Sequence, residues 1–116
     1  DLQPRTLAFA KSVRAFVKKM PKKIHTVDDC KQVVRSSGSI GANFIEADQA
    51  LSDNDFLHRI KICKKEAKET HYWLELLLVE ADQTLALEIK RLQQEAHELV
   101  KIFSSIIYRR RTTLSK

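Results

Sequence analysis

The 116-residue sequence predicts an all-α protein, folded as one antiparallel up-and-down four-helix bundle over residues 1–116. Three observations predict this fold. The chain holds only two Gly and two Pro, too few for a strand-rich fold with its frequent turns. Apolar and small residues recur in alternating steps of three and four positions, the period of a helix with one buried face. The pattern forms four stretches with short breaks between them, so consecutive helices should run antiparallel.

The two N-terminal helices are predicted at residues 4–20 and 26–51. Pro4 lies where the first turn of a helix tolerates proline, and Pro21 ends the first helix. Thr26 is the expected N-cap of the second helix. The core stripes of the two helices are Phe9, Val13, Phe16 and Met20, then Cys30, Val33, Ser37, Ile40, Phe44, Ala47 and Leu51.

The two C-terminal helices are predicted at residues 53–82 and 85–111. Ser52 is the expected N-cap of the third helix, with Asp53 and Asp55 near its positive end. A polar break separates it from the fourth helix. The core stripes are Phe56, Ile60, Cys63, Ala67, Thr70, Leu74, Leu77 and Ala81, then Leu85, Ile89, Leu92, Ala96, Leu99, Phe103 and Ile106.

The composition argues against a membrane span and against a disulfide framework. The longest apolar run has four residues, 76–79, whereas a helix needs roughly 18 to cross a bilayer. Cys30 and Cys63 are too few for a framework and lack the paired spacing of zinc ligands. We therefore expect a cytoplasmic protein without membrane contact, in which both thiols are reduced core residues.

No pattern in the sequence indicates catalysis. A di-iron carboxylate site in a bundle needs Glu-x-x-His pairs, and none of the four His follows a Glu at that spacing. Phosphate-binding loops, nucleophile elbows and zinc-protease motifs are also missing. We expect no enzyme activity, no catalytic residues, no cofactor and no metal site.

The charge of +6 is unevenly distributed along the chain. Residues 1–25 hold seven basic residues and one acid, residues 26–82 hold seven and eleven, and residues 83–116 hold seven and three. The outer faces of the terminal helices would attract nucleic acid if they formed one basic surface. Alternatively, the cations only complement the dipoles of the helix ends, and the two clusters lie at opposite ends of the bundle. The candidate contacts are Lys11, Arg14, Lys18, Lys19, Lys22, Lys23, Arg109, Arg110 and Arg111.

Several apolar residues fall outside the predicted stripes and indicate a lateral contact between protein chains. The candidate oligomer interface consists of Leu7, Ile45, Trp73 and Leu87. Gly38 and Gly41 lie within the second helix, where each indicates either a close approach of another backbone or a local kink.

Two polar groups in the middle helices are interpreted as structural. Asn43 and Glu46 should lie near Arg59 and Lys61 across the turn between the second and third helices, as a salt link or a network that fixes the turn. Glu66 and Glu69 lie among lysines and are expected to form a solvated face of mixed charge.

Three segments carry a resemblance to a known family: Ser-Ile-Gly-Ala-Asn-Phe-Ile-Glu-Ala at 39–47, Asp-Phe at 55–56 and Glu-Ala-Lys-Glu-Thr-His-Tyr-Trp-Leu at 66–74. The sequence resembles the four-helix-bundle family of 23S ribosomal RNA intervening-sequence proteins. The resemblance implies a bacterial homopentamer of bundles and supplies no catalytic residues. A structurally analogous bundle is the accessory variability protein of diversity-generating retroelements, a basic pentamer that binds a reverse transcriptase and nucleic acid.

Two functions follow from the charges, the outward apolar residues and this resemblance. The first is a homo-oligomeric bundle that binds RNA or DNA through the basic surface of its first and fourth helices. The second is an interaction scaffold whose partner is a protein, such as a polymerase or a reverse transcriptase, without direct contact to nucleic acid.

Overall fold

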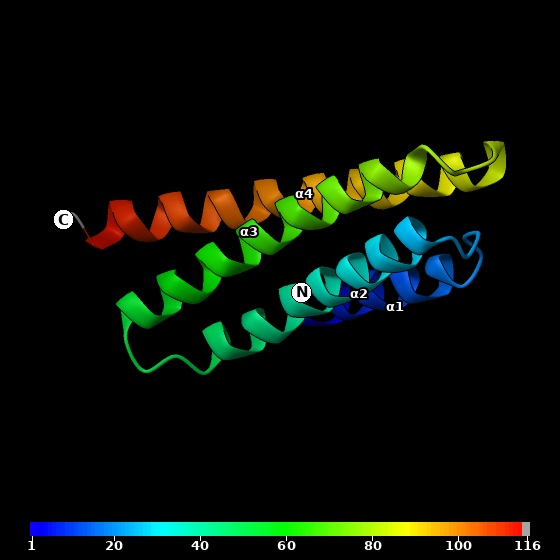
Figure 1. The fold of residues 1–116 in the computed structure, drawn as a ribbon. Coiled ribbons are helices and arrows are strands. Elements are labelled where there is room, and N and C mark those ends of the chain that lie inside the picture. The colour runs from blue at the N-terminus through cyan, green and yellow to red at the C-terminus, as the bar shows by residue number, and fades with distance from the viewer. Residues whose placement is uncertain (115–116) are drawn as a thin grey trace.

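The computed structural model describes residues 1–114, and these residues form four α-helices without a strand. The helices are α1 (Leu2–Val17), α2 (Ile24–Asp48), α3 (Asp53–Leu78) and α4 (Gln83–Leu114). Each helix runs antiparallel to the one before it, in an elongated body of 51 × 22 × 19 Å (Figure 1). The predicted all-α four-helix bundle is therefore confirmed.

The ends of α1 and α2 differ from the prediction because local capping decides them. Asp1 caps α1, since its side chain accepts a hydrogen bond from the Gln3 backbone N–H at 3.3 Å. Thr26 is not the N-cap of α2 but lies inside its first turn. Its buried hydroxyl accepts from the Lys23 N–H at 2.8 Å and donates to the Pro21 carbonyl at 2.6 Å, so α2 begins earlier than predicted.

The turn between α2 and α3 contradicts the predicted core position of Leu51. The helix ends at Asp48, and Leu51 lies in the turn with 97% of its surface exposed. Ser52 caps α3 as predicted, because its side chain accepts from the Asp55 N–H at 3.1 Å. At the next turn the Asp82 carboxylate accepts from the Leu85 N–H at 2.8 Å, which lets α4 begin at Gln83.

Most residues of the predicted stripes are buried in the core, but a few of them are only half-buried. Cys63 is buried as predicted, whereas Cys30 is only half-buried. In the last turns of α4, Ile107 is buried and Ile106 lies half-buried beside it, the reverse of the predicted order. The fully buried stripe residues are Val13, Phe16, Val33, Ser37, Ile40, Ile60, Cys63, Ala67, Thr70, Leu74, Leu77, Ile89, Ala96, Leu99 and Phe103.

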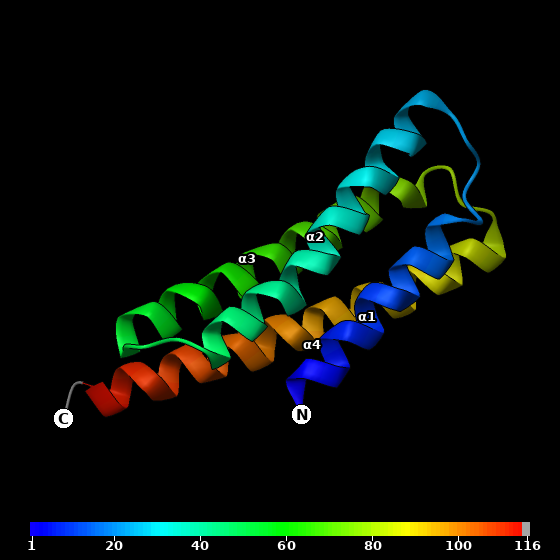
Figure 2. The same ribbon diagram turned by 90° about the horizontal axis from the view of Figure 1, so that it is seen from below.

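Helix α1 covers only part of the length of the bundle. With 16 residues it is half as long as the 32-residue α4, and its N-terminus lies midway along the body (Figures 1 and 2). Beyond that point only α2, α3 and α4 pack together. Phe44 of α2 contacts Phe103 of α4, with ring centroids 6.4 Å apart.

Gly38 and Gly41 both face α1, but they have different neighbours there. A Cβ atom on Gly41 would lie 3.0 Å from the Thr6 hydroxyl, and a Cβ on Gly38 would lie 3.2 Å from the Arg14 guanidinium. Both residues lie in a continuous helix and neither has a positive φ. Gly41 therefore permits a close approach of α1 to α2, whereas the neighbour of Gly38 is only the end of the long Arg14 side chain.

Candidate nucleic-acid interface

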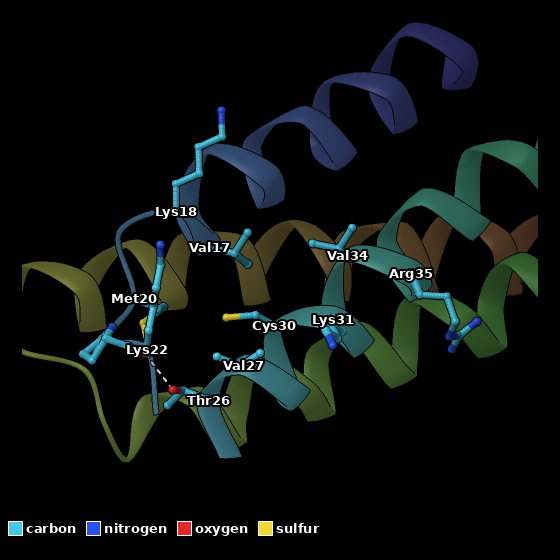
Figure 3. Close-up of a pocket in the computed structure, with 11 residues that line it drawn as sticks. Val17, Lys18, Met20, Lys22, Thr26, Val27, Cys30, Lys31, Val34 and Arg35 are labelled. Atoms are coloured by element: carbon cyan, nitrogen blue, oxygen red, sulfur yellow. Dashed lines mark hydrogen bonds between the residues drawn. The ribbon is translucent and has the colours of Figure 1, made fainter. Parts of the chain in front are cut away.

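Five exposed cations gather on the outer side of α1 and α2, and we call them the basic face: Lys11, Arg14, Lys18, Lys22 and Lys31. The first three are spaced three and four residues apart, so they share one side of α1. Lys18, Lys22 and Lys31 border a single pocket (Figure 3). The Arg14 guanidinium reaches across to Gly38 of α2. Within the described part of the chain, none of the five forms an ion pair.

Two of the predicted contact residues turn away from the basic face. Lys19 donates to Glu88 of α4 at 2.8 Å, and Lys23 donates to Glu80 at 2.9 Å. Glu80 also lies 2.7 Å from the His25 ring, and these two partners lower the pKa of its carboxyl. Lys19 and Lys23 therefore tie the α1–α2 connection to the α3–α4 end of the bundle.

The arginines near the end of α4 lie far from the basic face. Arg110 donates to Asp53 at 2.7 Å, and its guanidinium carbon lies 4.1 Å from the centre of the Phe56 ring. These contacts place the last turns of α4, which carry Arg109, Arg110 and Arg111, beside the α2–α3 turn. The connection between α1 and α2, which carries Lys18 and Lys22, lies at the opposite end (Figure 1). The basic residues of the terminal helices therefore form two separate clusters.

Lys31 belongs to the basic face, although the distribution of charge along the sequence does not indicate it. It lies in the segment 26–82, which is acidic as a whole. A sum over a segment conceals which face of the helix each charge occupies. Lys31 lies one helical turn after Val27 and one turn before Arg35. This spacing puts it on the side of α2 that borders the pocket beside α1, and the sequence shows that spacing.

A polar network lies between α2 and α3. Arg35 donates to Glu66 at 2.9 Å and to Glu69 at 3.2 Å. Glu66 is only 5% exposed, so the prediction of a solvated face was wrong for this residue. Burial acts to raise the pKa of the Glu66 carboxyl, but hydrogen bonds from Arg35, Glu69 and Ser39 outweigh burial and lower the pKa to about 2. The hydrogen bond shared with Glu66 raises the pKa of Glu69.

Two further hydrogen bonds join α2 and α3 beside this network. The hydroxyl groups of Ser36 and Thr70 are buried and 2.8 Å apart. Nearer the turn, Arg59 donates to the Asn43 side chain at 3.0 Å, which confirms the predicted proximity of these two residues. These contacts join α2 to α3.

The predicted interface residues occupy different environments. Leu7 and Ile45 are 56% and 52% exposed and line one groove of about 560 Å³ between α1 and α2, together with Gly38 and Gly41. Leu87 is 58% exposed but lies on α4, outside this groove. Trp73 is half-buried against the core, with its ring 5.2 Å from that of Tyr72.

Residues 1–114 contain neither a metal-binding cluster nor a membrane-spanning helix. No three His, Cys, Asp or Glu side chains among these residues gather closely enough to hold a metal ion. None of the helices formed by these residues has the length and apolar character needed to cross a membrane.

Comparisons with known proteins agree with the resemblance seen in the sequence. The family model described as 23S rRNA-intervening sequence protein matches residues 2–105. A similar solved structure is the 1.70 Å crystal structure of a protein with unknown function from the S23 ribosomal protein family of Bacteroides thetaiotaomicron VPI-5482. The two chains share 34% identity, with a TM-score of 0.76, over 92% of this chain and 98% of that one. No curated protein matches the sequence. The chain belongs to the family of 23S rRNA-intervening sequence proteins.

Proposed function

We propose that this protein is a non-enzymatic, cytoplasmic, homo-oligomeric bundle that binds nucleic acid through its basic face. The arrangement of the five cations supports this proposal above all else. Lys18, Lys22 and Lys31 border one pocket, and Lys11 and Arg14 have the spacing that puts them on the same side of α1 as Lys18. None of the five is neutralised by a carboxylate of the described residues. Ammonium and guanidinium groups placed in this way attract phosphates. The nucleic-acid contact then lies on α1 and α2, whereas the sequence predicted it on the first and fourth helices.

The chemistry of the basic face favours contact with the phosphate backbone. Its groups are four lysines and one arginine on helices and a short loop, without an aromatic side chain among them on which a base could stack. Binding should therefore tolerate many sequences. If all five cations neutralise phosphates, the slope of log K against log salt should be roughly −3 to −5, from about 0.7 to 0.9 per contact.

Neutralising the basic face tests the proposal. In a variant with Lys11→Gln, Lys18→Gln, Lys22→Gln and Lys31→Gln, we expect the magnitude of the salt slope to fall by about 3 for single-stranded RNA. Fluorescence anisotropy at several salt concentrations measures this slope. The matched control changes four exposed lysines of α3 and α4 to Gln and lowers the net charge equally: Lys61, Lys65, Lys68 and Lys90. Equal slopes for the two variants, or no binding by the wild type at low salt, would contradict the proposal.

We further propose that the groove at Leu7 and Ile45 is the contact between copies in a homopentamer. Exposed leucine and isoleucine in one groove favour burial against another chain. Light scattering coupled to size exclusion should then give five times the chain mass of 13.4 kDa. Ile45→Asp should dissociate the assembly, whereas Leu51→Asp, the same change at a 97% exposed turn residue, should not. A monomeric wild type would exclude the pentamer.

The same groove favours a second function, a scaffold for a protein partner such as a polymerase or reverse transcriptase. In that case, the groove would be occupied by the partner and the basic face would be dispensable. Pull-down from the native host after nuclease treatment separates the two functions. A partner that survives nuclease and is lost with Ile45→Asp supports the scaffold, and a partner that nuclease removes supports nucleic-acid binding.

A further inference from the structure

A pocket of about 560 Å³ lies where α1, the following loop and the first turns of α2 meet. Its volume falls in the range of sites that enclose small molecules. Figure 3 shows the Cys30 side chain reaching from α2 towards Met20, with Val17 and Val34 beside it. The walls are apolar and consist of Val17, Met20, Pro21, Val27, Cys30 and Val34.

The rest of the lining is almost entirely cationic. Lys18, Lys22, Lys31 and Arg35 complete it, and no Asp or Glu is among the lining residues. Arg35 is already paired with Glu66 and Glu69, so the three lysines supply the unpaired charge. The other polar residue is Thr26, whose hydroxyl is engaged by Lys23 and Pro21. The apolar walls therefore suit an apolar part of a ligand, which needs no hydrogen bonds. The cations at the rim suit a negatively charged group at the end of that ligand.

The pocket is short because Arg14 interrupts the groove between α1 and α2. Its guanidinium lies over Gly38, one turn beyond Val34 and Arg35. The apolar groove at Leu7 and Ile45 begins only on the other side of Gly38. A helix of a partner protein needs apolar contacts over several turns, which this interrupted groove does not provide. A nucleobase would leave the polar atoms of its edge unpaired against the apolar walls.

We propose that this pocket binds an amphipathic monoanion, an aliphatic chain that ends in a carboxylate. The chain lies against Val17, Val27 and Val34, and the carboxylate pairs with the lysines at the rim. Each methylene that enters the pocket should lower Kd about fourfold, from the free energy of burying one CH₂ group. The site shares three lysines with the basic face, but binding of the small anion requires no nucleic acid.

Three probes test the two parts of the ligand separately: decanoate, octanoate and decanol. Titration of ¹⁵N-labelled protein should show shifts of the amides around Val17, Val27 and Cys30, with decanoate binding more than tenfold tighter than octanoate. Decanol, which has the tail without the charge, should bind much more weakly than decanoate. Equal affinity for decanoate and decanol, or shifts that lie elsewhere in the bundle, would overturn the proposal.

Two variants and a chemical probe locate the site. Val27 is 39% exposed, so Val27→Asp should leave the fold intact and place a repelling carboxylate in the pocket. We expect at least a tenfold loss of decanoate affinity, while Leu51→Asp at the opposite end of the molecule should bind like the wild type. An unchanged affinity of Val27→Asp would refute the assignment.

Cys30 supplies an independent readout, because Cys63 is buried and serves as the internal reference. Burial and the charge of Asp29 raise the pKa of the Cys30 thiol, so alkylation is followed by mass spectrometry at mildly alkaline pH. Decanoate should protect Cys30 in proportion to its occupancy. Alkylation of Cys30 at the same rate with and without saturating decanoate would also refute the assignment.

Discussion

Phe103→Ala should lower the free energy of unfolding by about 3–5 kcal/mol, the usual cost of emptying the site of a buried aromatic ring. Phe103 is fully buried, and its ring lies 6.4 Å from that of Phe44 of α2. Because a domain of this size has a total stability of about 5–15 kcal/mol, one such change removes a large fraction of it.

Urea unfolding followed by circular dichroism measures this effect at one fixed protein concentration, since self-association makes stability depend on concentration. The matched control is Tyr108→Ala, an aromatic residue on the same helix that is 72% exposed. It should change stability by about 0.5 kcal/mol or less. Similar losses for the two variants would show that the C-terminal half of α4 is not packed as described.

Arg35→Met should be the second most damaging of the changes considered, because it leaves the Glu66 carboxylate buried without its cation. Breaking a fully buried pair costs about 3–5 kcal/mol. The side chain of Glu66 is 7% exposed and that of Arg35 is 54% exposed, so water screens part of the pair. We therefore expect a loss of about 2 kcal/mol at neutral pH.

The pH dependence identifies the cause. The pKa of Glu66 is lowered in the folded state from 4.5 to about 2, so its ionised form stabilises the fold above pH 4.5 and this stabilisation is lost as the pH falls towards 2. The raised pKa of Glu69 acts in the opposite direction and is relieved by protonation at low pH. The difference between wild type and Arg35→Met should therefore shrink from pH 7 to pH 2.5 in urea titrations.

A rescue and a control distinguish the buried charge from lost packing. Adding Glu66→Gln to Arg35→Met should recover much of the lost stability, since no charge then remains buried. Arg5→Met breaks another arginine–glutamate contact, in which Arg5 donates to Glu95 at 2.7 Å, but both side chains are substantially exposed. It should cost less than about 1 kcal/mol. A loss for Arg35→Met that is constant with pH would contradict this account.

Most of the fold could be predicted because burial of apolar residues dominates helix packing and leaves a visible period. Val13, Ile60 and Leu99 are examples of stripe residues that are fully buried. The exact helix ends could not be predicted, because they depend on single side-chain contacts. The buried hydroxyl of Thr26 and the turn that exposes Leu51 are two such cases.

The candidate site was only partly predictable, since a net charge does not show which face of a helix carries each residue. Lys11 and Lys18 share a face, whereas Lys19, one residue later, pairs with Glu88. The burial of Glu66 was missed for a related reason. Neighbouring lysines along α3 suggested a solvated surface, but its partner Arg35 comes from another helix.

The short first helix gives the molecule an uneven distribution of local stability. It contributes four buried residues to the bundle, whereas α3 and α4 contribute eight each, so α1 should detach and exchange its amide hydrogens at lower cost than the other helices. The basic face and both grooves between α1 and α2 exist only while α1 is docked. Any partner that binds there binds only the state in which α1 is docked, so it stabilises that state. Amide exchange in α1 should therefore slow in proportion to the ratio of the partner's concentration to its Kd.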